Sequence, residues 1–202
     1  MKKNIGILGG SFDPPHIAHV RLAEIAQKYC DEIWIVPCGY RDDKPWMSSY
    51  EIRYEMCQLA FRNMKICDFE RGMPIVSTYL LMRDIQEQHP EENFYFIIGT
   101  DLLISLDTWT YYHELISYTN FLVFHREGVA MNEKCNEYLA RKNFRDTGEK
   151  VQIELSSTYV RESIKESRRK NLSDEMLKDL LKKVIGIDEV AEAAYRYNLY
   201  SS

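Results

Sequence analysis

The chain has 202 residues, of which 45% are apolar and 28% carry a charge at neutral pH. This composition is typical of a folded soluble domain and excludes a globally disordered protein. Lys and Arg number 26 against 31 Asp and Glu, so the net charge is −5. An acidic chain is a poor candidate for a general nucleic-acid binder, although one local pocket is enough to hold a small anion.

The cysteines and the apolar segments argue against a disulfide-rich secreted protein and against a membrane protein. Five cysteines, an odd number, occur with no pair at C-x-x-C spacing: Cys30, Cys38, Cys57, Cys67 and Cys135. This favours reduced and mostly buried thiols over a disulfide framework. The apolar run after Lys2-Lys3 is too short for a signal peptide, and no segment approaches the ~18 apolar residues of a membrane span. We expect one cytoplasmic domain over residues 1–202 without a membrane partner.

Short apolar segments alternate with helical patterns from the N-terminus onward. The first three are a strand over 4–8, a helix over 16–29 and a strand over 32–36. A strand, a helix and a strand within about 35 residues form a βαβ unit, which requires parallel strands and a right-handed crossover.

The alternation continues to the C-terminus. The pattern predicts helices over 50–63, 78–88 and 109–117, strands over 94–98, 121–124 and 151–155, and a C-terminal helical segment in two or three pieces with Ser173 as an N-cap. The polar segments 38–49 and 126–150 are expected to be loops. The predicted fold is α/β, a doubly wound, Rossmann-like parallel sheet with helices on both faces. Such sheets bind ligands at the carboxyl ends of their strands.

The segment between the first strand and the first helix carries the strongest local signal, Gly9-Gly10-Ser11-Phe12-Asp13-Pro14-Pro15-His16-Ile17-Ala18-His19. Two glycines allow a tight turn and close approach of a ligand, and a helix N-terminus favours an anion. His16 and His19 are three apart and share one face of a first helical turn. Two histidines alone are most simply surface residues after a capped helix start. No further ligands for zinc are nearby.

A second anion-binding pattern follows the last expected strand, at Ser156-Ser157-Thr158-Tyr159-Val160-Arg161. Free N–H groups and hydroxyls gather at a helix start, with Arg161 about one turn inside. Arg can bind phosphate through two parallel hydrogen bonds. Seen alone, this pattern is an ordinary N-cap followed by a surface arginine. Two such patterns at opposite ends of one α/β chain are far more specific than either.

Together the two patterns resemble the nucleotidylyltransferase superfamily related to class I aminoacyl-tRNA synthetases, with its G-G-[ST]-F-D-P-x-H-x-x-H and I-S-S-T-x-x-R signatures. Ala18 stands where Gly is common, and Leu155 where Ile is common. The resemblance implies that both histidines contact the phosphates of ATP and stabilise the transition state. The ATP-binding residues that it implies are Gly9, Gly10, Ser11, Phe12, His19, Gly99, Asp101, Ser156, Ser157, Thr158 and Arg161.

The middle of the chain resembles bacterial-type nicotinate (or nicotinamide) mononucleotide adenylyltransferases. Asp101 ends a Gly-Thr-Asp turn, and Trp109 follows eight residues later. In that family the turn lies against adenosine and the tryptophan stacks on the pyridine ring. Thr110 stands where many members have Tyr, which leaves the choice between acid and amide open. The implied mononucleotide-binding residues are Ser11, Phe12, Lys44, Thr78, Trp109 and Arg126, and the implied catalytic residues are His16, His19, Lys44 and Arg161.

The resemblance implies an enzyme of NAD biosynthesis that joins ATP to nicotinate or nicotinamide mononucleotide and releases pyrophosphate. The attacking phosphate is already an oxyanion, so catalysis would rest on positioning and electrostatics. Mg²⁺ would arrive with ATP, without a resident metal site. The alternatives are a pantetheine-phosphate adenylyltransferase, a cytidylyltransferase and an inactive nucleotide-binding module. Nucleic acid is not an expected partner, and the sequence leaves open whether the chain forms a homo-oligomer.

Overall fold

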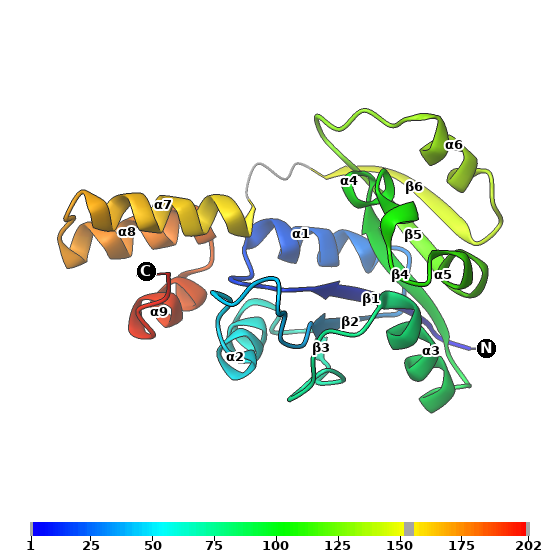
Figure 1. The fold of residues 1–202 in the computed structure, drawn as a ribbon, viewed down its shortest axis with the longest axis horizontal. Helices are drawn as coiled ribbons and strands as arrows, with labels where there is room; N and C mark the ends of the chain where they lie inside the picture. Colours follow the sequence, from blue (N-terminus) through cyan, green and yellow to red (C-terminus); the bar gives the residue numbers. More distant parts are fainter. Residues whose placement is uncertain (1, 152–155, 201–202) are drawn as a thin grey trace.

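A computed structural model describes residues 2–151 and 156–200 (Figure 1). Within these residues one parallel sheet contains the strands β1 (Asn4–Gly10), β2 (Glu32–Pro37), β3 (Lys65–Ile66), β4 (Asn93–Gly99), β5 (Asn120–Arg126) and β6 (Phe144–Val151). Their order is β3-β2-β1-β4-β5-β6, the doubly wound Rossmann order. The order reverses between β1 and β4, so the predicted fold class is confirmed and the carboxyl ends of these two strands flank the switch point.

Helices cover both faces of the sheet. On one face, α1 (Ile17–Ala26) and α2 (Tyr50–Ala60) share a buried cluster with Leu8 of β1. On the other face, a second buried cluster includes Ile5 and Ile7 of β1 together with residues of α3 (Thr78–Gln88), the short α4 (Thr100–Leu103), the 3-10 turn η1 (Leu106–Thr108), α5 (Tyr112–Tyr118) and α6 (Glu133–Leu139). Because both faces of β1 are buried, the strand is apolar at successive positions rather than at alternate ones.

The C-terminal segment forms three helices, α7 (Ser157–Arg169), α8 (Asp174–Ile185) and α9 (Asp188–Arg196). They extend beyond the sheet next to α2 (Figure 1) and share a third buried cluster with Met56 of that helix. Ser173 caps α8 as predicted, because its Oγ accepts a hydrogen bond from the Met176 N–H at 3.3 Å. Helix α2 therefore packs on the sheet and on the C-terminal helices at once.

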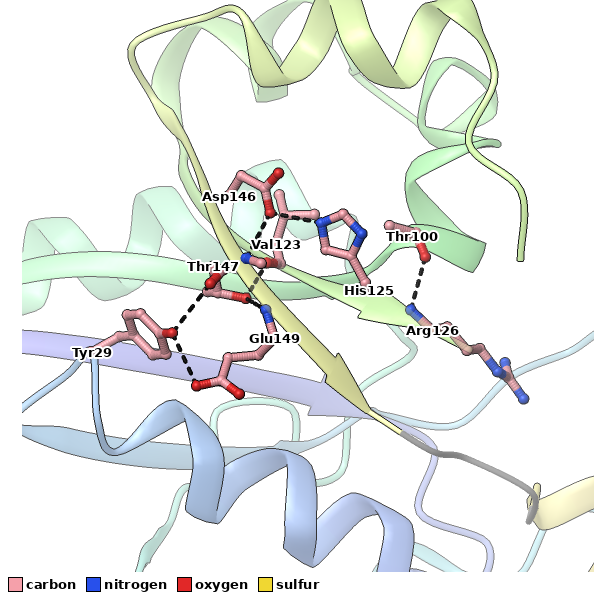
Figure 2. A network of polar contacts seen from close by, with 9 residues as sticks. Tyr29, Thr100, Val123, His125, Arg126, Asp146, Thr147 and Glu149 are labelled. Atoms are coloured by element: carbon pink, nitrogen blue, oxygen red, sulfur yellow. Dashed lines mark hydrogen bonds and ion pairs between the residues drawn. The ribbon is translucent and has the colours of Figure 1, made fainter. Parts of the chain in front are cut away.

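The prediction of a loop over 126–150 was wrong, because this segment contains α6 and the edge strand β6 (Figure 2). Edge position explains the polar sequence of β6, since only its ends are buried. Side chains hold it in place: Thr147 Oγ1 donates to the Val123 carbonyl at 2.8 Å, and the Tyr29 hydroxyl donates to the Thr147 carbonyl at 3.2 Å. The strand expected over 151–155 lies, apart from Val151, outside the described residues.

Smaller differences concern element boundaries. The expected helix over 109–117 begins at Tyr112, because Tyr111 has a left-handed backbone (φ 58°) that no α-helix accepts. The two-residue strand β3 was not predicted, since two residues carry no periodicity. All five cysteines are free and buried, as expected. No helix in the described part of the chain is long and apolar enough to cross a membrane.

Candidate active site

A cleft of about 440 Å³ opens at the switch point of the sheet. It is bounded by the loop after β1, the ends of β2, β4 and β5, and the start of α7. Most of the predicted site residues line it, namely Gly9, Gly10, Ser11, His16, His19, Thr78, Gly99, Asp101, Trp109, Arg126, Ser156 and Ser157. A second hollow of about 570 Å³ between α2, α8 and α9 includes none of the predicted residues. The topology thus gathers both end motifs and the middle segment at one edge of the sheet.

The two histidines form a stacked pair at the start of α1. Their ring centroids are 3.8 Å apart with planes 26° from parallel. The backbone N–H of His16 donates to Nδ1 of His19 at 3.2 Å. Because Nδ1 accepts, the neutral His19 ring carries its proton on Nε2, which is left to donate elsewhere.

Burial controls the charge of this pair. His16 is only 2% exposed, and burial, assisted by the positive charge of Arg126, lowers its pKa to about 4. The pKa of His19 lies well below its usual value, chiefly through burial and then through His16 and Arg126. Both rings are therefore neutral at pH 7 in the free protein. They offer N–H donors rather than full positive charges.

Phe12 lies beneath His19 rather than in the cleft. Its side chain is 2% exposed, and its ring meets the His19 ring edge to face with centroids 5.2 Å apart. The same ring packs against Phe61 of the core at 5.6 Å. Phe12 therefore braces His19 from below, and a contact from Phe12 to a ligand would have to come from its backbone.

The Gly99-Thr100-Asp101 turn joins the last residue of β4 to the first two residues of α4. A Cβ atom on Gly99 would lie 2.4 Å from Oδ1 of Asp101, so the carboxylate occupies the space that a side chain at residue 99 would need. The carboxylate forms an ion pair with the Arg126 guanidinium. The Arg126 backbone N–H donates to Thr100 Oγ1 at 2.9 Å (Figure 2). This turn therefore fixes Arg126 from both its backbone and its side chain.

Trp109 combines a core contact with exposure to the cleft. Its ring packs edge to face on Phe96 with centroids 6.1 Å apart and also lines the cleft. Thr78 is the first residue of α3, whose N-cap Ser77 accepts from the Leu80 N–H at 3.3 Å. Apolar side chains complete this part of the cleft, which can receive a planar ring: Ile75, Val76 and Leu81.

The second motif docks directly onto the first. Ser157 Oγ donates to the Pro14 carbonyl at 3.0 Å, and Nη1 of Arg161 donates to the Asp13 carbonyl at 2.8 Å. Nη2 of Arg161 donates to Thr158 Oγ1 at 3.0 Å. These contacts hold Arg161 and Thr158 at the rim of the cleft rather than in its lining.

Lys44 lies on the loop between β2 and α2, whose residues Cys38 and Arg41 line the cleft, but Lys44 is not itself among the lining residues. Burial lowers the pKa of its ammonium group, and the charges of Arg41 and Arg161 lower it further, while Asp43 opposes them. The positive charge of Arg161 therefore acts on the Lys44 ammonium group.

Sequence reasoning missed Arg53, a fully buried arginine on α2. Its guanidinium donates to four backbone carbonyls: Nη1 to Ser11 at 2.8 Å, Nε to Ser48 at 3.0 Å, and Nη2 to Cys38 at 2.8 Å and, at a longer 3.5 Å, to Gly39. It therefore joins the glycine loop to both ends of the loop that carries Lys44. An arginine in an amphipathic helix normally faces solvent, so the sequence carries no signal for this role.

Two buried carboxylates complete the frame around the cleft, and sequence reasoning did not assign a role to either. Asp13 accepts from the Tyr200 hydroxyl at 2.7 Å and from the Ser48 N–H at 3.1 Å. Glu70 accepts from the Gly39 N–H at 2.7 Å, and burial raises its pKa. The position of Asp13 inside the first motif was the one available signal.

The chain is similar in sequence to a known family and to named relatives. The sequence model of the cytidylyltransferase-like family matches residues 7–163. The chain is similar to a protein of Clostridium perfringens named a probable nicotinate-nucleotide adenylyltransferase, with 34% identity over 182 residues, covering 82% of this chain and 88% of the relative. A relative of the same name from Halalkalibacterium halodurans is 34% identical over 176 residues, with 82% of each chain covered.

A solved structure shares the fold across nearly the whole chain. It is the nicotinic acid mononucleotide adenylyltransferase of Plasmodium falciparum complexed with NaAD, with 26% identity and a TM-score of 0.78. The match covers 98% of this chain and 97% of that one.

Proposed function

This chain belongs to the cytidylyltransferase-like family and is a nucleotidyltransferase of NAD biosynthesis, and we propose that its cleft joins ATP to nicotinate mononucleotide with release of pyrophosphate. The observation that carries this proposal is the convergence of both end motifs, the Gly99–Asp101 turn and Trp109 on one cleft. The names of the relatives favour nicotinate over nicotinamide as the acceptor base.

In the proposed reaction, a phosphate oxygen of the mononucleotide attacks the α-phosphorus of ATP. A new P–O bond forms, the bond to the bridging oxygen breaks, and its electron pair leaves with pyrophosphate. The acceptor oxygen is already ionised at pH 7, so no strong base is needed. The protein must bring two polyanions together and stabilise charge on the leaving group.

We assign ATP binding to Gly9, Gly10, Ser11, the Phe12 backbone, His19, the Gly99–Asp101 turn, Ser156, Ser157, Thr158 and Arg161. The neutral imidazole of His19 supplies an Nε2–H donor, while His16 orients that ring through its backbone N–H. Lys44 and Arg161 bring positive charge to the phosphates from the rim. Mg²⁺ would come with ATP, held chiefly by phosphate oxygens and water, as is usual for this ion.

We assign the mononucleotide to the other half of the cleft. Trp109 offers a ring on which a pyridine can stack, an arrangement worth roughly 1 kcal/mol beyond burial. Thr78 at the start of α3 and Arg126 would meet the polar groups of the nucleotide, with Ser11, the Phe12 backbone and Lys44 near its phosphate. Phosphopantetheine carries no aromatic ring for Trp109, which disfavours the pantetheine-phosphate alternative.

Pyrophosphate release from Mg-ATP tests the proposal. Purified protein is incubated in parallel with nicotinate mononucleotide, nicotinamide mononucleotide and phosphopantetheine. We expect release with a pyridine mononucleotide, with a higher kcat/KM for the nicotinate form. Pyrophosphate release with phosphopantetheine alone would identify the protein as an adenylyltransferase of coenzyme A synthesis instead. Binding of ATP without release in any arm would indicate an inactive nucleotide-binding module.

A further inference from the structure

Trp46 is an exposed tryptophan outside the set of residues proposed to bind ATP and the mononucleotide. It lies on the loop between β2 and α2, two residues after Lys44, and 48% of its surface is exposed. The other two tryptophans, Trp34 and Trp109, pack in or against the main core. Because tryptophan is on average a highly buried residue, an indole with this exposed fraction is unusual and suggests a functional role.

The structure places the Trp46 ring against a phosphate-binding candidate. The guanidinium carbon of Arg161 lies 4.3 Å from the indole centroid, within the range of a cation–π contact. The same guanidinium donates to the Asp13 carbonyl and to Thr158 Oγ1. Three segments therefore fix Arg161: the glycine loop, the first turn of α7 and the loop that carries Lys44.

The two arginines near this contact, Arg41 and Arg161, differ in whether a carboxylate neutralises them. Arg41 on the same loop is paired with a carboxylate, since its Nε and Nη2 donate to Asp43 at 2.9 and 2.8 Å. Within residues 2–151 and 156–200, the Arg161 guanidinium contacts neutral groups instead: a carbonyl, a hydroxyl and an indole. An aromatic face steadies a guanidinium without neutralising it, whereas a carboxylate there would compete with a phosphate for the same N–H donors.

The contact also opposes a repulsion. Lys44 lies two residues before Trp46, and its ammonium group and the Arg161 guanidinium carry like charges that repel each other. Without an anion between them, this repulsion favours moving the Lys44 loop away from Arg161. Attraction between Trp46 and Arg161 holds that loop beside α7. The Lys44 loop and Arg161 are therefore already ordered before ATP binds. Less conformational entropy is then lost when ATP binds.

We propose that Trp46 is a positioning residue, whose indole face holds Arg161 beside Lys44 so that both cations meet the triphosphate of ATP. The inference rests on the proposed function, because it takes ATP as the ligand. It assigns Trp46 no contact with the nucleotide.

The test measures binding of a non-cleavable ATP analogue by calorimetry, with no acceptor present. Trp46→Ala should weaken binding about fivefold, as expected for a partly exposed cation–π contact. Trp46→Phe keeps an aromatic face and should stay within about twofold of wild type. Met176→Ala serves as the matched control, because it removes a large side chain of similar exposure on α8. It should leave the affinity unchanged.

A double-mutant cycle separates positioning from a general loss of structure. If Trp46 acts through Arg161, Trp46→Ala should add almost nothing in an Arg161→Ala background. A full fivefold effect in that background would overturn the inference, as would equal affinities of wild type and Trp46→Ala. Wild type that binds the analogue but joins it to no acceptor would refute the proposed reaction alone. Wild type that does not bind the analogue would overturn both.

Discussion

Replacing Arg53 with methionine should be among the most damaging single changes outside the cleft lining. Methionine keeps much of the apolar volume but removes the guanidinium, leaving the carbonyls of Ser11, Cys38 and Ser48 without their donors. Each hydrogen bond from a charged donor contributes about 1.5–3 kcal/mol, and breaking a buried charged network costs about 3–5 kcal/mol. Because the network borders the cleft, water can reach part of it. We therefore expect the free energy of unfolding to fall by about 4 kcal/mol, less than the summed contributions of the individual hydrogen bonds.

Urea and thermal unfolding measure this loss. For a chain of this length each kcal/mol shifts Tm by about 2–4 °C, so Tm should fall by roughly 8–16 °C. Arg62→Met is the matched control, since Arg62 is exposed and its one ion pair among the described residues is a surface pair with Glu189, worth less than about 1 kcal/mol. Arg53→Lys keeps the positive charge but lacks the several N–H donors of the guanidinium. Its Tm should lie between those of Arg53→Met and Arg62→Met. Equal unfolding free energies for Arg53→Met and Arg62→Met would refute the reasoning.

The remaining predictions concern the cleft. His16 has a pKa of about 4 when folded against 6.5 for the free group, so the unfolded state binds more protons between these values, and the protein loses stability as the pH falls through this range. At pH 5 wild type should have lost about 2 kcal/mol from this group, a dependence that His16→Asn removes; parallel pH profiles of the two proteins in urea would contradict it. His19→Ala should lower kcat at least ~100-fold, and near wild-type turnover would exclude its role as a donor. Trp109→Ala should raise KM for the mononucleotide far more than KM for ATP; an equal rise in both would point to general damage.

Much of the fold follows from local patterns in the sequence. Continuous apolar runs followed by helical periodicity predicted the parallel strands β1, β2, β4 and β5, because strands buried on both faces show no alternation. Helix α3 was predicted with its observed bounds, Thr78–Gln88, and Ser173 with its capping role. These features depend on residues a few positions apart, which a sequence displays directly.

The edge strand β6 shows where local pattern stops being informative. Only one of its sides pairs with another strand, and most of its side chains face solvent, so its sequence looks like a loop. Its place in the sheet depends on Tyr29 and Val123, which are far away in the chain.

The candidate site likewise combines features set by local sequence with features set by tertiary contacts. The sequence by itself determined which residue types lie after the strands, because the glycine turn, the histidine pair and the Ser-Ser-Thr helix start are contiguous patterns with local conformational requirements. Only the tertiary structure decided that Arg53 is buried, that Nδ1 of His19 is occupied and that Trp46 covers Arg161. The burial of Arg53 and the cover on Arg161 require partners from other segments, and the occupied His19 nitrogen requires a particular ring orientation. Such features arise when the sheet brings the ends of its strands together.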